Sequence, residues 1–111
     1  MRAQKSAPVA SENDLLTSVL HLAKVTGWRT YHARPARTEK GWRTAVSGDG
    51  VGFPDLILLR GSRGIAWELK SGRNLPSGAQ VDWLASFHAA GFNARIVRPS
   101  DWEYIEKELT R

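Results

Sequence analysis

The stretch GFPDLILLRGSRGIAWELKSG, residues 52–72, contains two apolar runs separated by a short turn sequence, GSRG. Apolar runs of this length on either side of a glycine-containing turn predict two antiparallel strands joined in a hairpin. We expect strands at residues 55–60 and 64–70, buried on both faces, so that helices must cover the sheet. Three charged residues interrupt the pattern: Asp55, Glu68 and Lys70. A charge in a buried strand is costly unless it is paired, binds a metal or serves in chemistry.

Hairpin geometry predicts where these three charges lie relative to one another. Alternation along a strand places Glu68 and Lys70 on the same side. Pairing around the turn, in a register whose partner numbers sum to roughly 124–125, sets Asp55 opposite residues 69–70. The three charged side chains are therefore expected at the open end of one hairpin.

The residue types at this place indicate a hard metal ion. Two converging carboxylates repel each other unless a cation lies between them. Oxygen ligands without His or Cys beside them suit Mg²⁺ or Mn²⁺ rather than zinc. Such an ion polarises a phosphoryl oxygen and lowers the pKa of a bound water, the two requirements for hydrolysing a phosphodiester. Lys70 would orient or help to deprotonate that water; the alternative is a structural ion pair between Lys70 and one of the acids.

The sequence before the hairpin predicts one helix, one strand and a long connection. Ser11 outlines the N-cap of a helix with a capping box to Asp14, and Gly27 is a suitable C-cap. Residues 28–33 alternate weakly and are expected to form a first strand. The segment 34–52, with Pro35 and several glycines, is either a long loop or a ragged hairpin. Loops of this length are usually functional or disordered.

The sequence after the hairpin predicts a helix, a strand and a last helix. Ser77 and Gln80 outline a second capping box, and the helix that follows is expected to bury Val81, Leu84 and Phe87. Residues 93–99 form a further expected strand, which Pro99 ends. The last helix carries three apolar residues on one face: Trp102, Ile105 and Leu109. The resulting order α-β-β-β-α-β-α is that of an α/β protein with a mixed sheet flanked by helices.

Length and composition limit the class of protein. A chain of 111 residues is expected to form one domain, here residues 11–111 behind a flexible tail at residues 1–10. No apolar stretch approaches the roughly 20 residues that span a bilayer, and residues 1–14 lack the apolar segment of a signal peptide. The absence of cysteine fits a reducing compartment and excludes disulfides, zinc fingers and thiol catalysis. We therefore expect a cytoplasmic protein without a membrane partner.

The charge balance favours a polyanionic partner. The formal net charge is +5, from 16 basic and 11 acidic residues. This balance suits nucleic acid or an acidic membrane surface. The basic side chains gather in one segment: Arg29, Arg34, Arg37, Lys40 and Arg43. The alternative is a solvated loop with no partner.

The quoted stretch also resembles a known nuclease signature. Pro54-Asp55, then about a dozen residues, then Glu68-Leu69-Lys70 is similar to the motif of the PD-(D/E)xK nuclease superfamily. The segments GFPDLILLR, WELKSG, LPSGAQVDWL and AAGFNARIV, with the opening Glu-bearing helix, resemble the VRR-Nuc family in its compact stand-alone phage form. The resemblance runs from about residue 11 to residue 109 and implies a restriction-endonuclease-like core, a mixed sheet between helices.

The resemblance assigns roles to individual residues. It implies metal ligation by Asp55, Glu68 and the backbone carbonyl of Leu69, and catalysis by Lys70. It places the family's glutamine on Gln80 and its N-terminal helix acid on Glu12. Gln80 has a local alternative in the Ser77 capping box, and Glu12 has one in the helix dipole. His32 is left out of the catalytic set, because a lone histidine more often packs or faces solvent.

The function implied is a Mg²⁺-dependent DNA endonuclease, with Mn²⁺ able to substitute. Stand-alone members of this family resemble Holliday-junction resolvases, which implies branched DNA, a homodimer and, if the gene is phage-encoded, a bacterial host cell. Contacts to nucleic acid are expected from five residues: Arg34, Arg37, Lys40, Arg43 and Arg73. Two alternatives stay open, a nuclease of the same superfamily that acts on flaps or ends, and a catalytically silent DNA-binding module.

Overall fold

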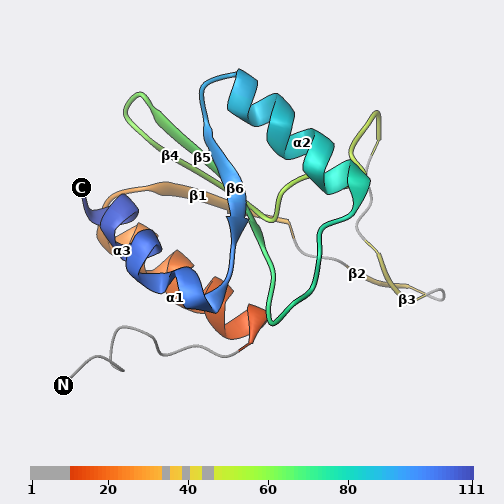
Figure 1. The fold of residues 1–111 in the computed structure, drawn as a ribbon, viewed down its shortest axis with the longest axis horizontal. Helices are drawn as coiled ribbons and strands as arrows, with labels where there is room; N and C mark the ends of the chain where they lie inside the picture. Colours follow the sequence, from red (N-terminus) through yellow and green to blue (C-terminus); the bar gives the residue numbers. More distant parts are fainter. Residues whose placement is uncertain (1–10, 34–35, 39–40, 44–46) are drawn as a thin grey trace.

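The described part of the chain folds into three α-helices and a four-stranded mixed sheet, with a separate two-stranded hairpin (Figure 1). The computed structural model describes residues 11–33, 36–38, 41–43 and 47–111, and only the backbone of residues 36–38, 42 and 43. The expected tail at residues 1–10 lies outside this range. Within it, no helix is long and apolar enough to cross a membrane. The expectation of an α/β protein with a mixed sheet between helices is confirmed.

The four-stranded sheet has the order β1-β4-β5-β6. Its strands are β1 (Arg29–His32), β4 (Leu56–Arg60), β5 (Arg63–Leu69) and β6 (Asn93–Val97). The pairs β1–β4 and β4–β5 are antiparallel, whereas β6 runs parallel to β5. The predicted hairpin at residues 55–60 and 64–70 is therefore present, and it forms the centre of the sheet.

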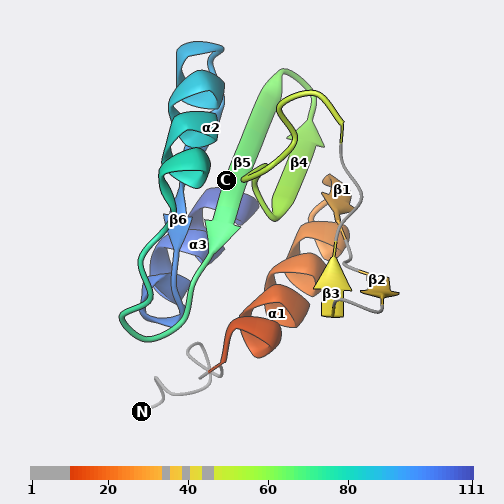
Figure 2. The same ribbon diagram turned by 90° about the vertical axis from the view of Figure 1, so that its right-hand side faces the viewer.

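The helices cover the two faces of this sheet unequally. Helices α1 (Glu12–Val25) and α3 (Trp102–Thr110) lie side by side on one face, and α2 (Gly78–Ala89) lies over β5 and β6 on the other (Figures 1 and 2). The face below α1 and α3 holds the apolar core: Leu15, Val19, Ala23, Trp28, Leu56, Leu58, Ile65, Trp67, Leu69, Val97, Trp102, Ile105 and Leu109. The predicted apolar face of the last helix is thus confirmed.

Local capping determines where the helices begin. Ser11 Oγ accepts a hydrogen bond from the Asp14 backbone N–H at 3.0 Å, and Gly27 follows α1 with a positive φ of 88°. Ser77 and Gln80 form a complete capping box at the start of α2. These contacts involve residues within one helical turn, and the sequence therefore predicted them correctly.

The turn of the central hairpin differs from the expected one. Leu56 pairs with Trp67, so that partner numbers sum to 123, and Arg60 pairs directly with Arg63. The turn therefore has two central residues, with Gly61 at a φ of 60° in the left-handed region that such turns favour. The predicted register was wrong by one to two residues. Extended by one pair, the observed register sets Asp55 opposite Glu68 instead of opposite residues 69–70.

Two further predictions need correction. The predicted order lacks β2 (Ala36–Thr38) and β3 (Gly41–Arg43), an antiparallel pair that confirms the hairpin alternative for residues 34–52. Strands of three residues are too short to show a period of two. In α2 no residue is buried, and Val81, expected on the buried side, is 49% exposed. That helix covers only part of its sheet face, which leaves Val81 in solvent.

Side chains from the closed end of the hairpin, and Trp28 just before β1, hold the last turn of α3. Trp28 Nε1 donates to the Leu109 carbonyl at 3.0 Å, and Arg60 Nη1 donates to the same oxygen at 3.1 Å. Arg63 Nη2 donates to the Glu108 carbonyl and forms an ion pair with its carboxylate, both at 2.9 Å. The last carbonyls of a helix lack partners within the helix. These three side chains therefore supply hydrogen-bond donors to the last carbonyls of α3.

The variant Arg60→Met tests this end of the molecule. It keeps an apolar stem but removes the donors to α3, so we expect the free energy of unfolding to fall by about 1–3 kcal/mol. Urea denaturation followed by tryptophan fluorescence measures the change. The matched control Arg29→Met removes an exposed arginine of β1 and should change stability by less than about 0.5 kcal/mol. Equal stabilities of the two variants would contradict this account of the α3 terminus.

Candidate active site

Asp55 and Glu68 meet at the open end of the central hairpin. Asp55 Oδ2 accepts a hydrogen bond from the Leu69 backbone N–H at 2.9 Å, which ties the residue before β4 to the end of β5. Glu68 is 3% exposed, and it is the one charged side chain buried among the described residues. The two acids therefore lie close together, and Glu68 is almost fully removed from solvent.

The environment of Glu68 opposes its negative charge. Burial first, and then the neighbouring charge of Asp55, raise the pKa of Glu68 to about 7 from its ordinary value of 4.5. Lys70 acts in the opposite direction but does not outweigh these two effects. The ionised form of Glu68 is thus destabilised in its surroundings, and a cation bound beside it would stabilise that form.

The two oxygens of Glu68 differ in their partners. Oε2 lies 3.4 Å from Lys70 Nζ and accepts a hydrogen bond from Gln80 Nε2 at 2.9 Å. Oε1 is buried and receives no hydrogen bond from an N–H or O–H donor of the described residues, although the Asp55 carboxyl group lies within hydrogen-bonding reach of the Glu68 carboxyl group. Buried polar atoms are nearly always satisfied, so an orphan oxygen of this kind calls for a ligand, an ion or a water.

Gln80 joins the local cap of α2 to the acid in β5. Its Oε1 accepts from the Ser77 backbone N–H at 2.8 Å, while its Nε2 donates to Glu68. The sequence left the capping role and the site role as alternatives, and the side chain makes both contacts because its amide has an acceptor at one end and a donor at the other. The capping box therefore orients the amide toward Glu68.

The donor set at this end fits a hard divalent ion. It consists of the Asp55 and Glu68 carboxylates and the Leu69 carbonyl, which points to the same side of β5 as the Leu69 N–H bonded to Asp55. Within the described ranges, no group of three or more His, Cys, Asp or Glu side chains is arranged to hold a metal. Two carboxylates with a carbonyl and waters form a ligand set that Mg²⁺ accepts.

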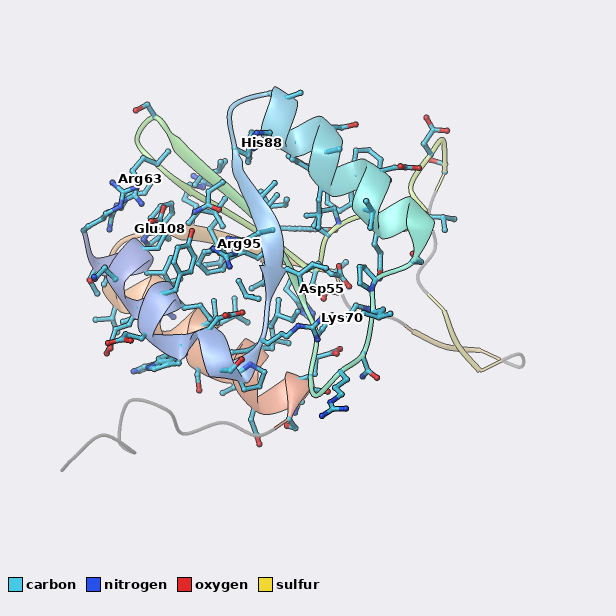
Figure 3. The ribbon with its side chains drawn as sticks, in the orientation of Figure 1. Asp55, Arg63, Lys70, His88, Arg95 and Glu108 are labelled. Atoms are coloured by element: carbon cyan, nitrogen blue, oxygen red, sulfur yellow. The ribbon has the colours of Figure 1, made fainter. Side chains whose placement is uncertain are left out.

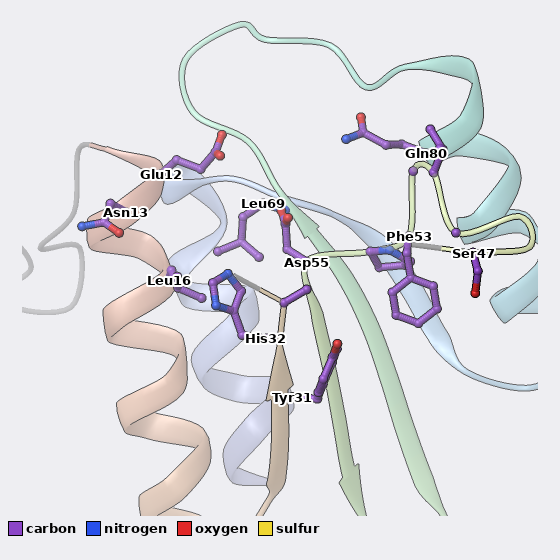
Figure 4. Close-up of a pocket in the computed structure, with 15 residues that line it drawn as sticks. Glu12, Asn13, Leu16, Tyr31, His32, Ser47, Phe53, Asp55, Leu69 and Gln80 are labelled. Carbon is purple, nitrogen blue, oxygen red and sulfur yellow. The ribbon is translucent and has the colours of Figure 1, made fainter. Parts of the chain in front are cut away.

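A pocket of about 890 Å³ opens beside Asp55 (Figure 4). Its walls come from the first turns of α1, the end of β1, the segment at 47–53 and the start of α2. The residues that line it include Glu12, Asn13, Leu16, Tyr31, His32, Ser47, Phe53, Asp55, Leu69 and Gln80. Glu12, an exposed residue, and Gln80 lie on opposite sides of Asp55 in Figure 4. Both resemblance-based candidates thus lie beside Asp55.

Only some of the basic residues expected at the site or in contact with nucleic acid have described side chains. Lys70 and Asp55 lie near each other, away from Arg63 and Glu108 (Figure 3). Arg73 is exposed in the turn that follows β5. The remaining expected contacts to nucleic acid lie outside the described residues or have no described side chain: Arg34, Lys40, Arg37 and Arg43.

The structure adds residues that the sequence did not place at this site. Tyr31 and His32 reach the pocket because β1 pairs with β4, so that His32 lies opposite Leu56 next to Asp55. Arg98 Nη1 donates to the Gly72 carbonyl at 3.2 Å, which brings another cation to the loop after Lys70. No local signal marks these residues, because long-range strand pairing positions them.

Comparisons of this chain with family models, with curated proteins and with solved structures found no match.

The raised pKa of Glu68 predicts a pH-dependent effect of Glu68→Gln on stability. Between pH 4.5 and 7, the folded protein without metal keeps a proton that the unfolded chain loses. Its stability therefore falls as the pH rises through this window, whereas a neutral glutamine avoids that loss. We expect Glu68→Gln to stabilise the protein at pH 8 by on the order of 1–3 kcal/mol, and much less at pH 4.5.

Thermal unfolding in EDTA, followed by circular dichroism, measures this difference. Glu106→Gln, a change at an exposed residue of α3, serves as the control and should show no growth of its effect with pH. If Glu68→Gln had the same effect at both pH values, Glu68 would not carry the raised pKa.

Proposed function

We propose that this chain is a divalent-metal-dependent endonuclease with a PD-(D/E)xK core, which hydrolyses phosphodiester bonds in DNA. The observation that carries the proposal is the arrangement of Glu68: buried, opposite a second carboxylate, and with one oxygen unpartnered while Lys70 and Gln80 bind the other. A structural ion pair with Lys70 would account for Glu68 Oε2 but not for the unpartnered Oε1. Mg²⁺ is the proposed cofactor, with Mn²⁺ able to replace it.

Each residue of the site has a distinct proposed task. Asp55 and Glu68 would hold the ion together with the Leu69 carbonyl. The bound ion would supply a Lewis acid for the phosphoryl oxygen and a water of lowered pKa. Gln80 holds Glu68 Oε2 and so directs Oε1 toward the ion site, while Glu12 faces the pocket from α1 and would orient water.

Lys70 supplies the positive charge beside the reacting phosphate. Its ammonium group lies 3.4 Å from Glu68 Oε2, and its side chain is 16% exposed, so it is held close to the acids but reachable from solvent. An ammonium at this place stabilises the negative charge that develops on the phosphoryl oxygens. It also orients or helps to deprotonate the attacking water.

The proposed substrate is branched DNA, cut by a homodimer. The net charge of +5 favours DNA, and Arg73 and Arg98 flank the loop after Lys70. Contacts to DNA are also proposed for Arg34, Arg37, Lys40 and Arg43. A four-way junction needs two nicks related by a two-fold axis, which a C₂ dimer of a single-site chain supplies.

Substitutions at the acids and at Lys70 test the chemistry. Asp55→Asn or Glu68→Gln should abolish Mg²⁺-dependent cleavage, because either change removes a ligand charge. Lys70→Ala should slow cleavage by at least about 10²-fold while metal affinity stays close to that of the native protein. Cleavage of end-labelled DNA in Mg²⁺, Mn²⁺, Ca²⁺ and EDTA is the measurement, with Ca²⁺ expected to support binding without turnover.

Two surface variants serve as controls. Asp82→Asn changes an exposed acid of α2, and Lys107→Ala changes an exposed lysine of α3; both should cleave at the native rate. Undiminished cleavage in EDTA, or by Asp55→Asn, would exclude the proposed mechanism. DNA binding without any cleavage in Mg²⁺ or Mn²⁺ would leave the catalytically silent module as the better description.

A panel of junction, flap, splayed-arm and linear duplex DNA tests the substrate. We expect paired, symmetric nicks in the four-way junction and slower cleavage of linear duplex, together with the mass of a dimer in solution. A monomer, or a flap cut faster than a junction, would contradict the resolvase assignment while keeping the nuclease one.

A further inference from the structure

The pocket beside Asp55 is larger than a metal site needs. A volume of about 890 Å³ is near the upper end of the roughly 300–1,000 Å³ usual for small-molecule sites. A metal ion and one phosphate group would fill only the part next to Asp55 and Leu69. The remaining space extends from Asp55 between α1, the end of β1 and the segment at 47–53 (Figure 4).

Two exposed aromatic rings line this remaining space. Tyr31 is 55% exposed although it lies in a strand, where its backbone is held by pairing with Ile57. Phe53 is 36% exposed and lies two residues before Asp55. In Figure 4 both rings lie on the same side of Asp55, and His32 lies on the other side, next to Leu16. Aromatic rings in a pocket whose lining is mostly apolar suit a ligand with a flat apolar face, such as a nucleic-acid base.

Phe53 is supported from behind, so its exposed side is a fixed wall. Its ring packs edge-on against Trp83 at a centroid distance of 5.0 Å and against Phe87 at 5.6 Å. Trp83 is itself anchored, since its Nε1 donates to the Asp49 carbonyl at 2.9 Å. A wall held in this way loses little conformational entropy when a ligand packs on it.

The approach of this segment to α2 depends on a glycine. Gly52 has a φ of 87°, and a Cβ on it would lie 2.7 Å from the Ala79 backbone carbon. The chain can therefore pass against α2 only without a side chain at this position. This contact fixes the path of the chain just before the hairpin. Phe53 and Asp55, which follow Gly52 closely, therefore both line the pocket.

We propose that the pocket receives one unstacked nucleotide of the strand that is cut, with its base against Tyr31 and Phe53. The inference rests on the proposed nuclease function, because the phosphate of that nucleotide would lie at Asp55 and Glu68. Base stacking on aromatic side chains is strong and tolerates any base. In a continuous duplex, the neighbouring base pairs cover both faces of each base. The substrate class is therefore DNA whose base stacking is interrupted at the cleavage point, as at a branch point or beside an unpaired nucleotide.

Binding of two matched DNAs tests this inference without relying on cleavage. One is a short fluorescein-labelled duplex, and the other is the same duplex with one unpaired nucleotide in its centre. Fluorescence anisotropy at low ionic strength, in EDTA and in Ca²⁺, gives the ratio of their dissociation constants. We expect the DNA with the unpaired nucleotide to bind at least about fivefold more tightly.

Variants of the aromatic wall assign the effect to the pocket. Tyr31→Leu should bring the ratio close to one, whereas Tyr31→Phe, which keeps the ring, should preserve it. Leu59→Ala is the matched control, because Leu59 is 44% exposed and lies in the neighbouring strand β4 without lining the pocket. Phe53→Leu provides a second test should Tyr31→Leu fail to give the native circular dichroism spectrum.

The outcomes separate this inference from the proposed function. A native ratio near one in both buffers, or a ratio that neither Tyr31→Leu nor Phe53→Leu lowers, would overturn the nucleotide pocket even if Mg²⁺-dependent cleavage occurs. A ratio that depends on the two rings, in a protein that does not cleave DNA, would support the pocket and exclude the nuclease.

Discussion

The pairing of β4 with β5 is the constraint on which the rest of the structure depends. It sets Leu56 against Trp67 on the core face, and by the same register it brings Asp55 opposite Glu68 at the open end. The hydrogen bond from the Leu69 N–H to Asp55 ties the two strands together at this end. Glu68 pairs with Ile96 of β6, and Gln80 of α2 donates a hydrogen bond to it. A shift by one residue would exchange the two faces of the strand, with Trp67 under α2 and Glu68 in the core. The face under α1 and α3 thus holds the apolar core, while α2 covers only part of the other face and leaves room for the pocket.

The acids near the two ends of the sheet have opposite pKa shifts. At the closed end, burial acts to raise the pKa of Glu108, but hydrogen bonds from Arg111, Asn93 and Arg63 bring it below its usual value. At the open end, burial and Asp55 raise the pKa of Glu68, and Lys70 does not compensate. Glu108 is thus a satisfied structural acid, while Glu68 keeps an unpartnered oxygen.

Much of the fold followed from the sequence alone because its causes are local. The hairpin at 52–72, the Ser11 and Ser77 caps and the apolar face of the last helix each depend on residues within a few positions of one another. The same locality predicts that Asp55, Glu68 and Lys70 gather at one end of one hairpin. Periodicity and capping act over one turn or one strand, and a sequence displays both directly.

Only the tertiary structure decided the features that need contacts between distant segments. Pairing of β1 with β4 brought Tyr31 and His32 to the pocket, and docking of Gly52 on α2 brought Phe53. Packing of α2 against β5 likewise brought the amide of Gln80, already held in its local cap, to Glu68. Such contacts join positions separated by many residues, and they form only when burial of the whole core selects one packing of the elements.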